Sequence, residues 1–241
     1  MEVRDMPAIN NAAKLASVIL GVALFSGNAL AESWKLELDE GGVKLYTSES
    51  DRSPIKTYKV TTTVRGNLSS LVALLNDHTA QPKWMDKVLS VEKLQQMKDG
   101  ENLFYTVFDA PWPAKDQDNV LYSKWHQDAT SYEMVQTVMS EPEYLNESKG
   151  RQRQAYFKAE WRLLPMGNGN VHVTYQAEVD PGLKRVPEWM KNMFVYEMPV
   201  KTIQNMNALS LDRYVDATFA YVKEPVDTAV AANAIAVASE E

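Results

Sequence analysis

Side chains that act as acids, bases or metal ligands are few in this sequence and poorly spaced for such work. The three histidines, His78, His126 and His172, lie far apart, so no H-x-H or H-E-x-x-H metal-binding pair is present. Asp116 and Asp118 form a close carboxylate pair of the kind that general acid–base chemistry uses. They directly precede a predicted strand, which favours a turn or capping role for this pair.

Nucleophiles and phosphate-binding loops are also missing from the sequence. The chain has no cysteine, which excludes disulfides, zinc–thiolate sites and thiol nucleophiles. It has no G-x-S-x-G nucleophile motif, phosphate-binding glycine loop or dinucleotide motif. The net charge of −7 argues against nucleic acid, which requires a basic patch, and against broad electrostatic adhesion to anionic lipid. We therefore expect no catalytic residue, no metal, no cofactor and no nucleic-acid partner.

Tryptophan and methionine are the residues that stand out. The chain has 6 tryptophans and 11 methionines. Flexible thioethers suit adaptable apolar surfaces, and pockets for small ligands are mostly apolar and aromatic. The content therefore indicates either an apolar ligand pocket or an ordinary hydrophobic core, and both interpretations stay open at this point.

The elements that position these side chains are mostly strands. Short segments rich in alternating apolar residues are separated by hairpin-length turns, such as Asp99–Gly100 and Gly167–Asn170. This pattern favours an antiparallel sheet over βαβ units. The predicted strands are 34–38 (or a short helix), 43–47, 55–64, 88–97, 103–108, 120–127, 132–139, 152–164 and 171–179.

Helices are predicted at three places. Leucine and valine recur at helical spacing over 68–75, with Asn67 as the cap, and a short helix follows at Pro82–Met85. Pro187 suits a first helical turn, and a mostly apolar stripe from Val200 to Val222 predicts a long C-terminal helix. The predicted fold class is α+β, with one long curved antiparallel sheet, an early helix or two and that C-terminal helix.

The first 31 residues have the pattern of a cleavable signal peptide. Arg4 and Lys14 supply positive charge, the run Leu15–Phe25 is small and apolar, and Ala29–Ala31 offers a cleavage site. The apolar run is shorter than the ~20 residues that a membrane-spanning helix needs. We expect cleavage after Ala31 and a periplasmic or secreted domain, with a retained membrane anchor as the alternative.

The predicted domain organisation follows from these boundaries. Residues 1–31 are the signal peptide and residues 32–223 the folded domain. The segment 224–241 is rich in alanine and valine, has no aromatic residue, and is expected to be a disordered tail.

A set of short motifs resembles a known family. Pro111–Pro113 followed by Lys115–Asp118 resembles the P-W-P-x-x-D-R-D segment of bacterial START (steroidogenic acute regulatory protein-related lipid transfer) domains. Matches in the same order cover roughly residues 34–215. Three matches lie in the first half: W…G-V-x-V-Y at Trp34 and Gly42–Tyr46, S-P-(I/L)-K at Ser53–Lys56, and P-x-W-M at Pro82–Met85. Three lie in the second half: V-R at Gln152–Arg153, W-x-L-x-P at Trp161–Pro165, and D-P-G-G…P-x-W at Asp180–Gly182 and Val186–Trp189. Gln117 stands where the family usually has arginine.

The resemblance implies a helix-grip fold, in which a curved antiparallel sheet wraps around a long C-terminal helix with an apolar tunnel between them. It implies binding or transfer of a lipid, a sterol or another apolar small molecule, without catalytic residues. We expect the ligand-binding residues to be Trp84, Met85, Tyr105, Trp112, Arg153, Trp161, Trp189, Met193 and Phe194. We also expect a monomer that contacts membranes transiently.

Two other functions stay open. The first is a helix-grip enzyme of the cyclase or hydrolase type, for which His126, Asp116 or Tyr105 would supply acid–base groups inside the cavity. The second is a non-enzymatic envelope protein whose groove is filled by its own side chains or by a partner chain.

Overall fold

The computed structural model describes residues 33–225. The predicted signal peptide, its cleavage site and most of the predicted tail lie outside these residues. Within the described part, no helix is both long and apolar enough to cross a membrane.

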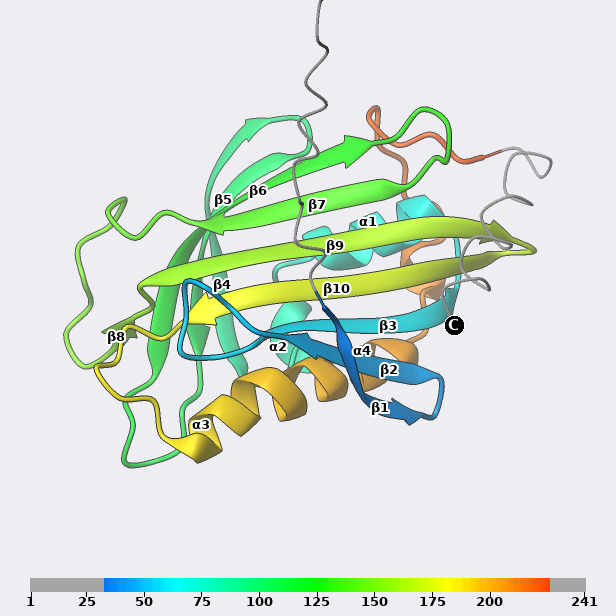
Figure 1. The fold of residues 1–241 in the computed structure, drawn as a ribbon. Coiled ribbons are helices and arrows are strands. Elements are labelled where there is room, and N and C mark those ends of the chain that lie inside the picture. Colours follow the sequence, from blue (N-terminus) through cyan, green and yellow to red (C-terminus); the bar gives the residue numbers. More distant parts are fainter. Residues whose placement is uncertain (1–32, 226–241) are drawn as a thin grey trace, which may run out of the picture. The chain divides into compact units, whose positions relative to one another are not determined.

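The described residues form one ten-stranded sheet with helices packed against it (Figure 1). Its strand order is β1-β2-β3-β10-β9-β7-β6-β5-β4, and β8 pairs beside β6. All pairings are antiparallel except that of β8 with β6. The strands are β1 (Lys35–Glu40), β2 (Val43–Ser48), β3 (Thr57–Arg65), β4 (Val88–Lys98), β5 (Glu101–Phe108), β6 (Gln117–Gln127), β7 (Met134–Ser140), β8 (Gln152–Arg153), β9 (Tyr156–Gly167) and β10 (Asn170–Asp180).

The hairpin of β9 and β10 shows why the sequence makes a sheet. Along β10 buried and partly exposed residues alternate, as the two-residue period of a strand requires. The turn uses Asn168 at φ 53° and Gly169 at φ 70°, the positive values that tight hairpin turns need. The predicted strand 152–164 is split, because Gln152 and Arg153 (β8) pair with β6 whereas the chain from Tyr156 onward (β9) pairs with β10 and β7.

The helices are short. α1 (Leu68–Asn76) begins as predicted at Asn67, whose side chain accepts a hydrogen bond from Ser70 N at 2.8 Å. They continue with α2 (Gln81–Trp84), α3 (Glu188–Asn192), the π-helical turn η1 (Met193–Glu197), α4 (Met198–Asn207) and the 3-10 turn η2 (Asp212–Tyr214).

The predicted C-terminal helix is wrong beyond Asn207, where α4 ends. Residues 208–225, which we call the strap, turn back toward α1 instead. Tyr214 donates a hydrogen bond to Asp77, and Tyr221 accepts one from Asn76. The apolar stripe thus continues past the helix because strap side chains pack against the same core, rather than because the helix itself continues.

The strap is also hydrogen-bonded to the end of β6 and to the start of α1. Lys223 exchanges two hydrogen bonds with the Gln127 side chain, at 2.7 and 2.8 Å. The carboxylate of Glu224 accepts from the backbone N–H groups of Leu68 and Ser69, the free donors at the start of α1. Described contacts therefore extend to Glu224, one residue into the predicted tail.

Candidate functional site

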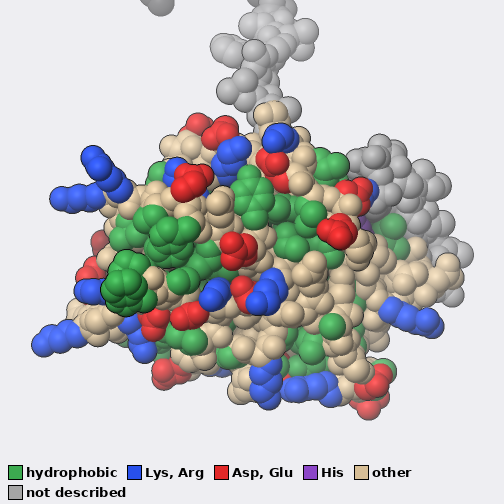
Figure 2. All heavy atoms as spheres, turned by 90° about the horizontal axis from the view of Figure 1, so that it is seen from below, with side chains coloured by type: hydrophobic (Ala, Val, Ile, Leu, Met, Phe, Trp, Pro, Cys, Tyr) green, Lys and Arg blue, Asp and Glu red, His purple; other side chains and the backbone are tan. Residues whose placement is uncertain are grey.

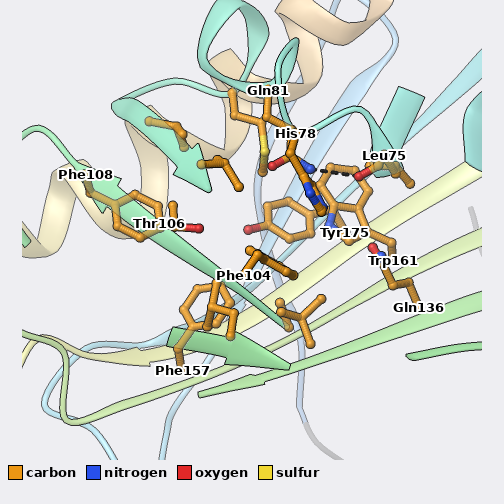
Figure 3. A pocket seen from close by; sticks show the side chains of 16 residues that line it. Leu75, His78, Gln81, Phe104, Thr106, Phe108, Gln136, Phe157, Trp161 and Tyr175 are labelled. Atoms are coloured by element: carbon orange, nitrogen blue, oxygen red, sulfur yellow. Dashed lines mark hydrogen bonds between the residues drawn. The ribbon is translucent and has the colours of Figure 1, made fainter. Parts of the chain in front are cut away.

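A cavity lies between the inner face of the sheet and the segment containing α1 and α2 (Figure 3). Its walls come from α1, α2 and the loops beside α2, together with β4, β5, β6, β7, β9 and β10. It encloses about 60 Å³. Met85, Phe104, Phe157 and Trp161 are among its apolar side chains.

Aromatic stacking builds one wall of the cavity. Trp161 of β9 stacks on Tyr175 of β10, with ring centroids 4.0 Å apart and 12° between the planes. Trp84 of α2 packs edge-on against Trp161 at 6.2 Å, and Phe104 of β5 lies 5.0 Å from the ring of His78. These contacts hold flat apolar surfaces in place beside the space, which suits an apolar ligand.

Four neutral polar side chains interrupt the apolar lining. The hydroxyl of Thr106 is buried and has no hydrogen-bond partner among the described residues. Gln81 Nε2 donates a hydrogen bond to Leu75 O at 2.7 Å, and the hydroxyl of Tyr175 is hydrogen-bonded to that of Tyr58. The fourth is Gln136, which is 6% exposed.

His78 adds an imidazole to the cavity wall. Burial lowers the pKa of His78 to about 4, helped by the positive charge of Lys93 and opposed by Asp77. The imidazole is therefore neutral at pH 7 and presents one donor and one acceptor.

Acid should destabilise the protein through His78. The unfolded chain protonates His78 near pH 6.5, whereas the folded protein does so only near pH 4. Between these values the unfolded state binds more protons, so the free energy of unfolding falls as the pH falls through this window. Relative to His78→Leu, the natural protein should lose about 1–3 kcal/mol from pH 7 to pH 4, measured by urea denaturation. Equal pH slopes in the two proteins would contradict this account of His78.

A buried ion pair lies outside the cavity. Arg153 Nε donates to Asp118 Oδ1 at 2.8 Å, and the two side chains are 4% and 1% exposed. Tyr105 donates to the other carboxylate oxygen at 2.6 Å. Burial alone would raise the pKa of Asp118, but the hydrogen bonds from Arg153 and Tyr105 and the charge of Arg153 hold it below its usual value.

Arg153 also fastens the loop between β7 and β8. Its guanidinium donates to the carbonyl oxygens of Pro142 at 2.7 Å and Leu145 at 3.1 Å. These bonds and the ion pair occupy the guanidinium, and Arg153 is not part of the cavity wall. Its geometry is that of a structural anchor.

The residue that replaces the family arginine is part of a buried amide network. Gln117 is 2% exposed, and its Oε1 accepts from Gln154 Nε2 at 3.0 Å. Gln154 Oε1 in turn accepts from Asn119 Nδ2 at 2.8 Å. A neutral glutamine thus completes a chain of amides where a charged side chain would need a counter-ion.

The nine residues predicted to contact a ligand fall into four places. Two of them, Met85 and Trp161, line the cavity. Three lie in the core around it: Trp84, Met193 and Phe194. Ligand contact by these residues stays a prediction.

The other four predicted contact residues lie farther from the cavity. Tyr105 and Arg153 belong to the ion-pair cluster around Asp118. Trp112 is 91% exposed, and Trp189 is 39% exposed. Trp189 lines a surface groove of about 370 Å³ between the β5–β6 loop and α3, together with Lys115, Leu183 and Arg185.

One group of exposed apolar side chains lies on the face that carries the C-terminal helix. Figure 2 shows hydrophobic atoms grouped over the α3 side of this face, with both basic and acidic side chains around them. Trp112 and Lys115 are exposed in the β5–β6 loop, Lys184 and Arg185 in the segment before α3, and Trp189 in the first turn of α3. We call these five residues the tryptophan patch.

The C-terminal helix holds one wall of the cavity. Asn205 of α4 donates to Trp84 O at 2.9 Å, and Thr202 accepts from Asp86 N at 3.0 Å. Met85, which lines the cavity, lies between these two attachment points. A displacement of α4 would therefore free Met85 and widen the space.

Sequence reasoning missed the polar half of the lining. From the sequence, His78 was considered only as a metal ligand, and Thr106 and Gln136 were not considered. The available signal was residue spacing, since every second residue of a strand lies on one face. Phe104, Thr106 and Phe108 of β5 line the cavity, as do Gln136 and Val138 of β7. Among the described residues, no group of His, Asp and Glu could hold a metal ion.

Comparison with known proteins gives consistent matches. The model of the START domain family matches residues 26–211. An uncharacterized protein of Pseudomonas aeruginosa is 34% identical over 199 residues, which cover 83% of this chain and 96% of that protein. The crystal structure of a STAR-related lipid transfer protein fragment from Xanthomonas axonopodis superimposes with a TM-score of 0.66 at 28% identity, over 73% of this chain and 98% of that one. Human STARD10 has the same fold, with a TM-score of 0.63 at 20% identity over 72% and 71% of the two chains.

Proposed function

This chain belongs to the START domain family, and from that premise we propose that it binds and transfers a lipid or other apolar small molecule. The family consists mostly of non-enzymatic domains that bind lipophilic ligands. The observation that carries the proposal is the aromatic cavity between the sheet and the α1–α2 segment. Moving one methylene out of water is worth about 0.8 kcal/mol. A site as apolar as the membrane interior provides the same gain, so the free energy of moving an acyl chain or ring system from the membrane into the protein is close to zero.

The ligand enters a cavity that must widen. A cavity of about 150 Å³ accommodates benzene, and drug-sized ligands occupy roughly 300–1,000 Å³, against about 60 Å³ here. We propose that the C-terminal helix moves to admit the ligand. Its π-helical turn η1 interrupts the regular helical hydrogen bonds between α3 and α4, and such turns are frequent at functional sites. The attachment of α4 to Trp84 and Asp86 links that motion to the cavity wall.

A transfer assay tests this function. Donor vesicles with a pyrene-labelled lipid are mixed with unlabelled acceptor vesicles, and the loss of excimer fluorescence is followed. The purified chain should accelerate the loss in proportion to its concentration. A rate no higher than spontaneous exchange, for neutral and charged pyrene lipids alike, would reject transfer.

We propose a binding protein rather than an enzyme. Asp116 and His126, two of the three candidate acid–base groups, are absent from the cavity wall, and the third, Tyr105, is bonded to Asp118. The cavity wall carries no carboxylate that could work beside His78.

The tryptophan patch is the surface that we propose for transient membrane contact. Tryptophan partitions into the interface of a bilayer, and Lys115, Lys184 and Arg185 would attract anionic headgroups around it. Trp112→Ala should weaken binding to phosphatidylglycerol-containing vesicles about 10-fold, because one large aromatic side chain no longer leaves water. Vesicle co-sedimentation measures the change.

The matched control for this experiment is Met97→Ala. Met97 is 53% exposed and lies on β4 near the opposite end of β5 from Trp112, so its removal should leave vesicle binding unchanged. An equal loss in both variants, or none in Trp112→Ala, would move the membrane contact elsewhere.

We also propose that the protein is exported. The support is the charge, apolar run and cleavage motif of residues 1–31. N-terminal sequencing of the protein from the periplasmic fraction of its host should begin at Glu32. An intact N-terminus in the membrane fraction would instead make it a tethered exchanger.

A further inference from the structure

The polar side chains of the cavity form a recognition site of their own. Thr106 is 3% exposed, and its Oγ1 has no hydrogen-bond partner within residues 33–225. Buried polar groups in folded proteins are almost always paired, so an unpaired hydroxyl aimed into a cavity indicates that something else completes it. Figure 3 shows this hydroxyl and the ring hydroxyl of Tyr175 pointing toward each other across the cavity.

The hydroxyl of Tyr175 can donate a hydrogen bond to a ligand. Its hydroxyl accepts a hydrogen bond from that of Tyr58, because this bond raises the pKa of Tyr58, as for a donor, and opposes the burial that raises the pKa of Tyr175 to about 12. The bond therefore uses the Tyr58 proton, the first of the two hydroxyl protons of the pair. The second proton remains available to an acceptor. Thr106 and Tyr175 together therefore present both a donor and an acceptor to the cavity.

The cavity has no charge with which to hold an anion. No Asp, Glu, Lys or Arg is part of its wall. Arg153, the cation that sequence reasoning placed at the ligand, is bonded to Asp118 and to loop carbonyls. A carboxylate or phosphate buried here would lose its hydration without gaining a counter-ion, which is costly in an apolar interior.

We propose that the cavity selects an uncharged ligand with a hydroxyl or carbonyl oxygen at one end, received by Thr106 and Tyr175, with its apolar body against Trp161 and Phe104. Fatty acids and phospholipids are excluded as preferred ligands. This assignment rests on the proposed binding function and goes beyond it by naming the ligand class. Gln136, which is buried and lines the same cavity, is an additional group for a second ligand oxygen.

The experiment compares three probes with the same alkyl chain. Dodecanol, laurate and dodecane compete with the neutral fluorescent dye N-phenyl-1-naphthylamine for the purified full-length chain at pH 8. Dodecanol should bind at least 10-fold more tightly than laurate. Thr106→Val should weaken dodecanol about 3- to 10-fold, the effect of one neutral hydrogen bond, and leave dodecane unchanged.

Two further variants keep the result interpretable. Thr106→Ser retains the hydroxyl and should retain dodecanol binding. Thr57→Val is the matched control, because Thr57 is buried on β3 and is not part of the cavity wall. Thermal melting of each variant verifies that the fold is intact.

The outcomes separate this inference from the function beneath it. If laurate binds as tightly as dodecanol, or Thr106→Val leaves dodecanol affinity unchanged, the neutral-ligand assignment is overturned while apolar binding stands. If neither the dye nor any of the three probes binds, the proposed binding function fails, and the assignment fails with it.

Discussion

Replacing Arg153 with methionine lowers the free energy of unfolding by about 3–5 kcal/mol, the cost of leaving one partner of a buried ion pair without its counter-charge. Asp118 is 1% exposed and would retain only neutral hydrogen-bond donors, Tyr105 and Ser148, without a counter-charge. The carbonyls of Pro142 and Leu145 would lose their donor as well, which loosens the β7–β8 loop. Urea denaturation monitored by tryptophan fluorescence measures the change.

Two variants sharpen this result. Arg151→Met is the matched control, because Arg151 makes an exposed hydrogen bond to Tyr105 and should cost less than about 1 kcal/mol. The double variant Arg153→Met with Asp118→Leu should recover part of the loss, since it removes the unpaired charge. A loss below about 1 kcal/mol in Arg153→Met would contradict the anchoring role and reopen a role for Arg153 at the ligand.

The same pair sets a pH limit on stability. The pKa of Asp118 lies below its unfolded value, so its contribution is present above about pH 3.8 and is lost as the pH falls through the lowered folded value. The loss from His78 comes earlier, between about pH 6.5 and pH 4. The two groups thus act in different pH windows and can be separated in one titration series.

The second large effect is the loss of ligand binding in Ala159→Leu. Ala159 is 3% exposed, lies on β9 and lines the cavity. A leucine side chain there fills the space of about 60 Å³ from which the ligand site must expand. We expect binding of N-phenyl-1-naphthylamine to become undetectable, at a stability cost of about 1–3 kcal/mol from overpacking.

The control makes the same change elsewhere. Ala73→Leu introduces the same side chain on α1, at a partly buried position outside the cavity wall. It should leave dye binding within twofold of the natural protein. Full binding by Ala159→Leu would place the ligand outside this cavity, in the groove beside Trp189 for example.

The sequence predicts the fold correctly at elements that a single local pattern determines, such as a strand, a turn or a helix cap. Alternation along β10, the Asn168–Gly169 turn and the Asn67 cap each carry their own physical cause, and all three are confirmed. The family resemblance and the helix-grip fold class are confirmed as well. The C-terminal helix is present, but its predicted extension beyond Asn207 is wrong, because apolar residues at helical spacing indicate burial and do not require a helix. Tyr214 and Tyr221 are held in the strap by tertiary contacts that no local pattern encodes.

The site was predictable only in its apolar half. Tryptophan and methionine signal an aromatic interior, and Met85 and Trp161 do line the cavity. Thr106, Gln136 and His78 supply polar groups to the cavity wall, yet each is an ordinary residue in sequence. Their significance appears only when β5, β7 and the α1–α2 loop bring them to one space. Arg153 shows the converse, because it was predicted to contact the ligand, whereas it lies outside the cavity wall and pairs with Asp118.

The most direct test of apolar ligand binding is to identify what the cavity holds. The protein is purified from its native host without detergent, extracted for mass spectrometry, and crystallised. We predict one neutral apolar molecule per chain, with density in a widened cavity and an oxygen within hydrogen-bond distance of Thr106 Oγ1. A chain that yields no ligand, with a cavity that stays near 60 Å³ and holds only water, would contradict the central claim.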